Sequence, residues 1–342
     1  MSLTSRLVLS LLLGAAPTLL SPQPAAAYRY VRVGNAANAA ATPQAGFALM
    51  GGGTDLDEAF KFLCDHAGGG DLLVLRATGT DAYNPYIQGL CHLNSVATLV
   101  IPSRVAASDP FVAETISHAS ALFIAGGDQA NYINFWQGTP VQTALNAAIA
   151  RGVPIGGTSA GLAVLGEHVY TAQGDKPDGP DLDAKTALAD PYGPRITLGS
   201  HFLDVPLLKG VITDSHFAKR NRMGRLLVFL ARLNEPDRKP IPPPSHNIRG
   251  IGIDERAAVL LEPDGKAKVI GQGVGAWFVG ASRASGLTLT RNQPLTFGSF
   301  EVEKIAPGHT FNLATWSGDG SQYQLTVKAG AVQSSQANGA IY

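Results

Sequence analysis

The sequence predicts an α/β fold: a mostly parallel sheet flanked by helices, with a small β-rich C-terminal portion. Between residues 47 and 165, short apolar runs alternate with segments of helical spacing, which is typical of parallel strands joined by helices. Beyond Gly250, short strands follow one another with turn residues between them. Hydrophobic residues make up 45% of the chain and charged residues 15%, which indicates a packed globular core and not a disordered chain.

The first 27 residues predict a secretory signal peptide. Arg6 supplies a positive charge, residues 7–20 are mostly apolar, and residues 25–27 are alanines that suit a cleavage site. The apolar stretch is short for a membrane span and contains a glycine and a proline. We therefore expect cleavage near Ala27 and an exported protein, periplasmic or extracellular, with no stable membrane anchor.

Further divisions follow along the chain. Residues 28–46 are rich in alanine and asparagine and predict a flexible leader; residues 47–280 predict the α/β domain and residues 281–342 the β-rich portion. The expected strands of the domain lie at 47–50, 72–75, 98–101, 121–124, 257–261 and 268–270, and its expected helices at 55–67, 110–117 and 141–150. The β-rich portion is expected to contain strands at 287–289 and 324–327.

Two polar segments interrupt this regular pattern. Residues 171–194 form an excursion that contains aspartates and prolines, which predicts either a lid or specificity loop, or a passive surface insertion. Residues 240–244 predict a proline-rich connector.

Charge and metal-ligand spacing exclude several functional classes. The formal net charge is zero, so no electrostatic signal favours nucleic acid or an anionic membrane surface. The histidines stand singly, and no metal-ligand spacing is present, so we expect no metal. The two cysteines, Cys64 and Cys91, either form a disulfide, as an exported protein allows, or remain two buried thiols.

The most informative segment extends from Val153 to Leu165. An apolar run ends in glycines, presents Ser159, and continues into small and apolar residues that suit a helix. This is the layout of a nucleophile elbow, in which a sharp strand-to-helix turn exposes the serine hydroxyl and glycines stand where a Cβ would clash. The helix N-terminus offers free N–H groups for developing negative charge. The alternative interpretation is a glycine-rich turn whose serine only caps the helix.

A serine hydroxyl needs a base that accepts its proton and an acid that orients this base. His216 is the predicted base, because an apolar strand leads into it and an arginine-bearing helix is expected to follow. In a single parallel sheet this places His216 at the same edge as Ser159. The acid stays open among three carboxylates: Asp254 and Glu255 on a glycine-flanked strand, and Asp214 two residues before the histidine.

Two backbone amides are expected to bind the oxyanion of the reaction. One is the N–H of Ala160, directly after the serine, and the other is the N–H of Gly127, in a glycine pair that follows the strand at 121–124. The glycine run at 51–53 is interpreted as a tight turn.

Together these segments resemble the cyanophycinase and peptidase-E-like family of serine peptidases, which share the class I glutamine-amidotransferase-like fold. The resemblance extends from about Phe47 to Gly280. It rests on four motifs in the family's order: Gly126–Gln129, Gly156–Gly161, Asp214–Arg225 and Gly252–Glu255.

The resemblance implies roles for the residues of these motifs and no cofactor. Ser159 is the nucleophile, His216 the general base and Glu255 the acid. The substrate pocket is implied to be lined by Gln129, Arg220, Arg222 and Arg225, because an arginine fork holds a carboxylate with two bonds. The family likeness also suggests a homodimer.

The hypothesis is therefore a secreted serine exopeptidase that hydrolyses cyanophycin, or related β-Asp-Arg or acidic peptides, to dipeptides. Ser215 departs from the family, because cyanophycinases usually carry a glutamine there, so the resemblance does not fix cyanophycin as the substrate. Two alternatives stay open. One is an α/β-hydrolase-type esterase with Ser159, Asp254 and His309; the other is a non-catalytic exported peptide-binding protein.

Overall fold

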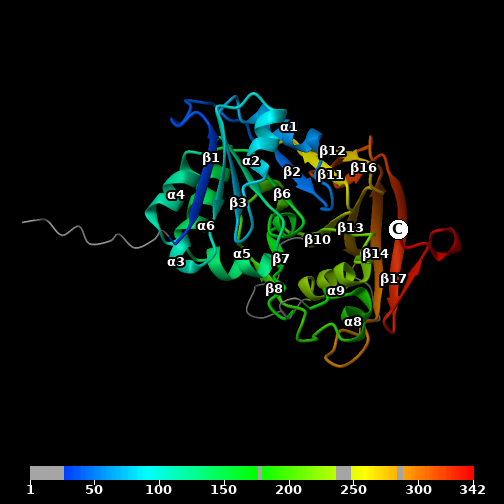
Figure 1. Cartoon of the computed structure of the whole chain (residues 1–342). Helices are drawn as coiled ribbons and strands as arrows, with labels where there is room; N and C mark the ends of the chain where they lie inside the picture. Colours follow the sequence, from blue (N-terminus) through cyan, green and yellow to red (C-terminus); the bar gives the residue numbers. More distant parts are fainter. Residues whose placement is uncertain (1–26, 176–178, 236–247, 283–287) are drawn as a thin grey trace, which may run out of the picture.

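Two large β-sheets organise the chain (Figure 1). The computed structural model describes residues 27–175, 179–235, 248–282 and 288–342. The expected signal peptide up to residue 26, the connector at 240–244 and the first residue of the strand expected at 287–289 lie outside these ranges. Among the described residues, no helix combines the length and apolar character needed to cross a membrane.

The first sheet consists, among the described residues, of β1 (Arg29–Gly34), β2 (Phe47–Met50), β3 (Asp71–Arg76), β4 (Ser95–Val100), β5 (Ala121–Ile124), β6 (Ile155–Thr158), β11 (Ala257–Leu261), β12 (Lys266–Gly271), β15 (Thr310–Asn312) and β16 (Ser317–Gly318). Their order across the sheet is β1-β4-β3-β5-β6-β2-β11-β12-β15-β16. The strands from β4 to β2 pair in parallel. Antiparallel strands extend the sheet on both sides, through β1 and through β11.

The second sheet consists, within the described ranges, of β7 (His168–Tyr170), β8 (Leu198–Ser200), β9 (Val211–Asp214), β10 (Arg249–Ile253), β13 (Ala276–Ser282), β14 (Phe297–Ile305), β17 (Ser321–Lys328) and β18 (Ala331–Ser334). Their order is β18-β17-β14-β13-β10-β9-β7-β8. Only β7, β9 and β10 pair in parallel here, and the other pairings that the structure describes are antiparallel.

Helices cover both faces of the parallel strands. The described helices are α1 (Asp57–His66), α2 (Tyr83–Leu90), α3 (Arg104–Ala107), α4 (Pro110–Ser117), α5 (Gln129–Trp136), α6 (Pro140–Ala150), α7 (Ala160–Ala163), α8 (Ala184–Ala189) and α9 (Met223–Leu233), with 3-10 turns η1 (Pro206–Leu208) and η2 (Ala337–Gly339). α1 and α2 pack on one face of the first sheet and α3 to α6 on the other. α8 and α9 pack on the second sheet.

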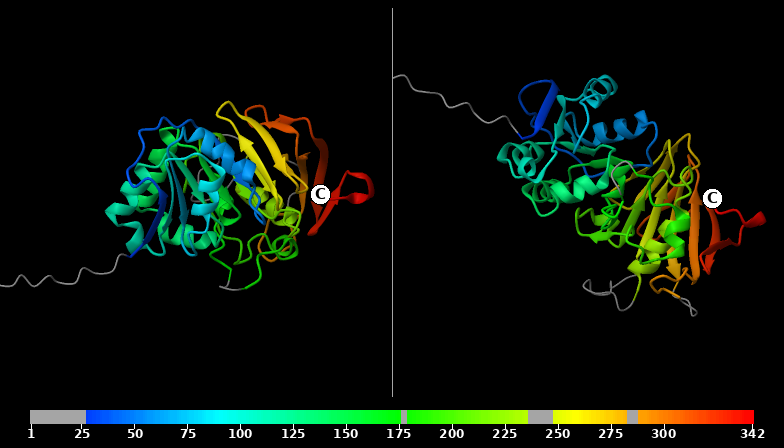
Figure 2. Two further views of the ribbon diagram at one scale, coloured as in Figure 1. Left: turned by 45° about the horizontal axis from the view of Figure 1, so that its top comes forward. Right: turned by 60° about the horizontal axis from the view of Figure 1, so that its bottom comes forward.

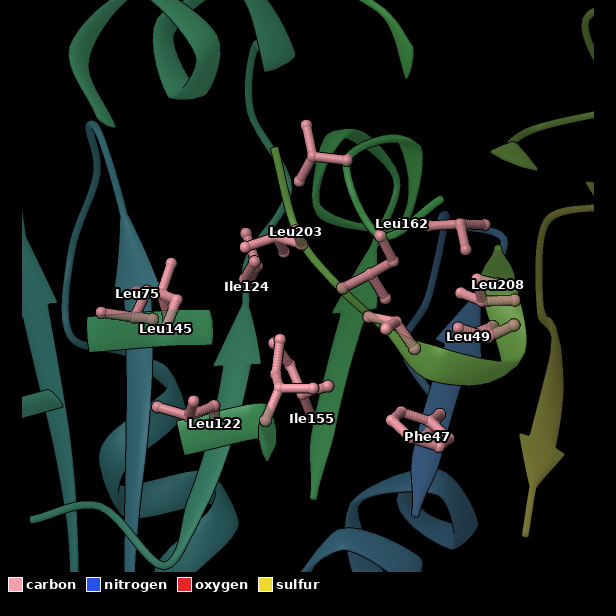
Figure 3. Close-up of a cluster of buried hydrophobic side chains, with 14 of the residues drawn as sticks. Phe47, Leu49, Leu75, Leu122, Ile124, Leu145, Ile155, Leu162, Leu203 and Leu208 are labelled. Carbon is pink, nitrogen blue, oxygen red and sulfur yellow. The ribbon is translucent and has the colours of Figure 1, made fainter. Parts of the chain in front are cut away.

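The alternation of side chains along each parallel strand builds two cores at once. In β2, Phe47 and Leu49 face the core under α3 to α6, whereas Ala48 and Met50 face the core under α1. The close-up in Figure 3 shows the first set: Phe47 and Leu49 lie beside Ile155 of β6, near Leu162 of α7. Because strands buried on both faces have no polar side, they are continuous apolar runs in the sequence.

The two sheets pack face to face beside β2 and β11. Phe278 of β13 stacks on Phe311 of β15, with ring centroids 3.7 Å apart and planes inclined by 11°. A stacked aromatic pair stabilises the fold by about 1 kcal/mol beyond the contribution from burying its apolar surface. The strands after residue 250 therefore do not stand apart. They extend both sheets, on the side of the molecule away from α3 and α4 (Figures 1 and 2).

The predicted α/β class is confirmed, with more antiparallel pairing than the sequence indicated. Residues 29–34, which the sequence assigned to a flexible leader, form β1 and pair with β4 along their whole length. Tyr28 and Tyr30 pack on Phe111 of α4, with centroid distances of 5.0 and 5.4 Å. Residues 29–34 do not alternate strictly between apolar and polar, and the strand is only half-buried, so the sequence carried no clear strand signal there. The predicted boundary at residue 280 falls inside β13.

A disulfide joins Cys64 in α1 to Cys91, the residue after α2. Both cysteines are buried, and the structure describes no free cysteine. Of the two states that the sequence left open, the structure therefore has the paired one. The cross-link closes a loop over a sequence separation of 27 residues, which restricts the unfolded chain.

We expect replacement of both cysteines (Cys64→Ser with Cys91→Ser) to lower the free energy of unfolding by about 3 kcal/mol, because the unfolded chain regains the entropy of the open loop. Urea unfolding of oxidised protein measures this change. A reductant should destabilise the wild type and leave the double variant unaffected. Equal stability of the two proteins under oxidising conditions would contradict the disulfide.

Candidate active site

Ser159 stands in a sharp turn between β6 and α7. Its φ of +53° and ψ of −114° are strained values for a residue with a side chain, as expected for a nucleophile elbow. The turn needs glycines because its backbone runs against neighbouring backbone: a Cβ on Gly161 would lie 2.0 Å from the carbonyl oxygen of Ile124, and one on Gly157 would lie 2.6 Å from Gly161. α7 has only four residues, so its dipole is small. Any stabilisation of negative charge at this turn therefore comes from the free N–H groups of its first residues.

His216 meets this serine from the other sheet. Ser159 Oγ lies 2.7 Å from His216 Nε2. The sequence placed both residues at one edge of a single parallel sheet, which is wrong in detail: β6 belongs to the first sheet, and β9, which leads into His216, pairs with β7 and β10 of the second. The two residues meet where the sheets adjoin.

Glu255 is the carboxylate that contacts the imidazole. Its Oε1 lies 2.7 Å from His216 Nδ1. The other two candidates are held elsewhere: Asp254 accepts a hydrogen bond from the Lys219 amide, and Asp214 forms an ion pair with Arg225. Because an ionised Glu255 only accepts, His216 Nδ1 carries the proton and Nε2 is free to accept the serine proton.

The glycine run 51–53 has a role that sequence reasoning missed. The carbonyl of Gly51 accepts the His216 amide at 2.7 Å. Gly52 packs against the imidazole so closely that a Cβ would lie 2.5 Å from Cε1, and its φ is +94°. A Cβ on Gly53 would lie 3.1 Å from Glu255. The run was interpreted as a tight turn because its partners lie more than 160 positions later in the sequence. Its position directly after a buried strand was the available signal.

The surroundings of His216 keep it neutral at neutral pH. Burial lowers its pKa below the ordinary value of 6.5, and the charges of Arg220 and Arg222 lower it further, while Glu255 opposes both effects. The hydrogen bond from His216 lowers the pKa of Glu255 in turn. A neutral imidazole next to an ionised carboxylate is the state in which a serine proton can be accepted.

A cavity of about 670 Å³ opens beside the serine hydroxyl. It is lined by Gly127 and Ala160, the two predicted sources of oxyanion donors, and by Gln129, the first residue of α5. Residues 171–194 contribute Ala172, Gln173, Asp175, Gly179 and Asp181 to its wall. This segment therefore lies at the candidate site, and it contains α8.

The three predicted arginines line the same cavity in different ways. α9 starts at Met223, so Arg220 and Arg222 lie in the turn before it and not on the predicted helix. Arg225, on the helix, is 2% exposed and bonds Asp214 through Nε (2.8 Å) and Nη2 (2.5 Å). Arg222 is also buried, whereas the side chain of Arg220 is 45% exposed. The Nε and Nη2 donors of Arg225 are therefore taken by Asp214, and they are not free to bind a substrate carboxylate.

His309 lies apart from this arrangement. It precedes β15, and its Nδ1 is 3.5 Å from Asp319 Oδ2. Asp254, its expected partner in the esterase alternative, bonds Lys219 instead. Among the described residues, no group of three or more His, Cys, Asp or Glu side chains is arranged to hold a metal ion.

Comparisons with known proteins agree with the resemblance that the motifs predicted. Residues 77–229 match the family model described as peptidase family S51, which includes Ser159, His216 and the three arginines but not Glu255. Cyanophycinase of Trichormus variabilis is 30% identical over 227 residues, which cover 64% of this chain and 65% of that protein. Cyanophycinase of Geminocystis herdmanii is 31% identical over 178 residues, which cover 51% and 55%. The chain thus spans just under two thirds of the length of the first relative.

Among solved structures, a peptidase from an acI-B1 Actinobacterium superposes with a TM-score of 0.49 at 17% identity, covering 80% of this chain and 98% of that one. The family model and the relatives confirm the resemblance that the motifs predicted.

We expect Glu255→Gln to lower kcat by about 10⁴-fold, because an amide no longer stabilises the imidazolium that forms in the transition state. It should also lower the pKa of His216 further, because the carboxylate that raises this pKa is removed. The base works in its neutral form, so activity falls as pH falls through this pKa. The acid limb of kcat/KM should therefore lie below pH 6.5 in the wild type and lower still in the variant. A pH-rate profile of both proteins measures this.

Asp214→Asn is the contrasting variant. It should lower the free energy of unfolding by about 3 kcal/mol or more, because it leaves the buried Arg225 without its counter-charge. Urea unfolding measures the loss. An acid limb that shifts in Asp214→Asn and stays in place in Glu255→Gln would show that Asp214, and not Glu255, orients His216.

Proposed function

Because residues 77–229 match peptidase family S51, we propose that this protein is an exported serine exopeptidase of the cyanophycinase type. The observation that carries the proposal is the relay from Ser159 Oγ to His216 Nε2 and from His216 Nδ1 to Glu255 Oε1, each step 2.7 Å long. Distances of this size allow direct proton transfer. The neutral state of the imidazole supports the same role.

In the proposed reaction, Ser159 Oγ attacks the scissile carbonyl carbon while His216 Nε2 takes the hydroxyl proton. The amides of Gly127 and Ala160 bind the oxyanion of the tetrahedral intermediate. His216 then gives its proton to the leaving amine, and the C–N bond breaks to leave an acyl-enzyme. Water attacks the ester with His216 again as base, and the serine is released with its proton. Glu255 holds the imidazole and stabilises its charged form throughout.

The proposed substrates are peptides with free carboxylates, such as cyanophycin or shorter β-Asp-Arg and acidic peptides. Arg220 and Arg222 stand in the cavity wall with guanidinium groups that suit carboxylates. Ser215 lies in the same wall and is buried. Because a serine reaches less far than the glutamine of cyanophycinases, we propose dipeptide or short acidic substrates alongside the polymer.

Incubation with insoluble cyanophycin and a panel of β-aspartyl dipeptides, followed by mass analysis, tests the substrate class. We expect release of dipeptides by the wild type and none by Ser159→Ala, because the variant has no nucleophile. A fluorophosphonate should label the wild type at Ser159 and not the variant. Peptide binding with neither hydrolysis nor labelling would favour a non-catalytic binding protein.

Replacing two histidines separately tests the base. His216→Ala should lower kcat by at least about 10³-fold. His309→Ala is the matched control and should stay within about twofold of the wild type, because His309 contacts Asp319 and does not line the cavity. The reverse order of effects would favour the esterase arrangement.

We propose export as the location, on two supports. The first 27 residues have the pattern of a signal peptide, and the Cys64–Cys91 disulfide suits an oxidising compartment. Expression of the full sequence in a bacterial host, followed by fractionation and intact mass, should give an exported form that begins near Tyr28. A full-length protein retained in the cytoplasm would contradict export.

A further inference from the structure

Asp181 occupies the two arginines that the proposed function assigns to the substrate. Its Oδ2 lies 2.6 Å from Nη1 of Arg220 and also bonds Nη2 of Arg222. Asp181 comes from the segment before α8, far in sequence from both arginines, and lines the same cavity as Ser159. A carboxylate of this protein therefore stands where a carboxylate of a ligand is expected.

The other acidic residues next to it are committed in different ways. Asp214 is fully paired with Arg225. Asp175 is held by Arg195 Nε at 2.6 Å and by the hydroxyl of Tyr170 at 2.7 Å. Asp214 Oδ1 also lies 3.6 Å from Arg222 Nη1, and Glu255 Oε1 lies 3.9 Å from Arg220 Nε, but Asp181 is the carboxylate of the described cavity wall that bonds both arginines directly.

Exposure separates Asp181 from Asp214. The side chain of Asp181 is 50% exposed, whereas that of Asp214 is 4% exposed. Burial raises the pKa of Asp181, but Arg222 and Arg220 outweigh this effect, so the group is charged at neutral pH. The pair with Arg220 is exposed on both sides and can exchange partners at small cost, whereas Arg222 is buried and keeps Asp214 Oδ1 within 3.6 Å of its Nη1 when Asp181 leaves. Asp181 can therefore leave the arginines, and Asp214 cannot.

The bonding of Arg222 is incomplete with Asp181 in place. Its Nη1 donates to the carbonyl of Ser215 at 2.9 Å and its Nη2 to Asp181, but its buried Nε has no hydrogen-bond partner among the described residues. Arg225 shows the complete arrangement in the same cavity, with one carboxylate on Nε and Nη2 together. A carboxylate that approaches Arg222 side-on would satisfy the Nε donor that Asp181 leaves free.

We propose that Asp181 is a specificity-determining residue: it is an internal counter-ion that a substrate carboxylate must displace from Arg220 and Arg222. The proposal rests on the proposed function of this site and deepens it. It predicts selection for ligands whose carboxylate can take both donors of the Arg222 fork. A ligand without a carboxylate gains nothing from the exchange and leaves Asp181 in place.

Ligand binding in a Ser159→Ala background tests the proposal without turnover. Titration calorimetry at low salt would use a β-aspartyl dipeptide and its neutral amide as probes. Adding Asp181→Asn should tighten the acidic probe about fivefold, because the variant amide no longer competes for the arginines, and should leave the amide probe within about twofold. Asp183→Asn is the matched control: it removes the same charge two residues away, where Asp183 caps α8 and touches neither arginine.

The outcomes separate the two proposals. An affinity for the acidic probe that is unchanged, weaker or undetectable in Asp181→Asn would overturn the role of Asp181, because the carboxylate would then only brace the arginines. An equal gain in Asp183→Asn would overturn it too. If the acidic probe binds more tightly as expected but the wild type hydrolyses no peptide, the counter-ion role stands and the peptidase proposal fails.

In a second arm, Arg222→Lys added to the Asp181→Asn protein should abolish the gain, because lysine keeps the charge and lacks the two-donor fork. A gain that persists with lysine would show that charge alone attracts the probe, against selection by the fork. Circular dichroism of each variant confirms that the fold is kept.

Discussion

The hydrogen bond from the amide of His216 to the carbonyl of Gly51 ties the two sheets together at the candidate site. Gly51 follows β2, which pairs with the strand that leads into Ser159, and His216 follows β9 of the other sheet. The connection between β10 and β11 crosses the same junction in three residues, one of which is Glu255. Each member of the triad therefore depends on how the sheets meet, and small glycines at 51–53 permit the close approach.

Local features of the sequence were the ones that could be predicted. The elbow at Ser159 depends on residues within a few positions of it, and strands buried on both faces show as apolar runs. Pairing between distant strands could not be predicted, because an apolar run does not say which neighbour it takes. For that reason the strand β9 was placed in the same sheet as Ser159, and the contacts of the glycine run 51–53 with His216 and Glu255 were not predicted. The acid stayed open among three carboxylates, since their partners are set by tertiary contacts.

Charge is distributed by depth around the cavity. The deepest pair, Asp214 with Arg225, is buried on both sides and holds the start of α9 to the end of β9. The outer group, Arg220 with Asp181, is half exposed. Arg222 lies between them, within 3.6 Å of Asp214 and bonded to Asp181. A rigid inner pair and an exchangeable outer pair give one wall both a fixed shape and a replaceable partner.

The triad collects its members from positions 159, 216 and 255, and Glu255 lies in the link between β10 of the second sheet and β11 of the first. During synthesis, an emerging chain can form the early parallel strands and expose its serine long before the glutamate leaves the ribosome. A chain that has emerged only as far as His216 therefore lacks the carboxylate that contacts the imidazole, so the candidate triad is complete only after the link between β10 and β11 has folded.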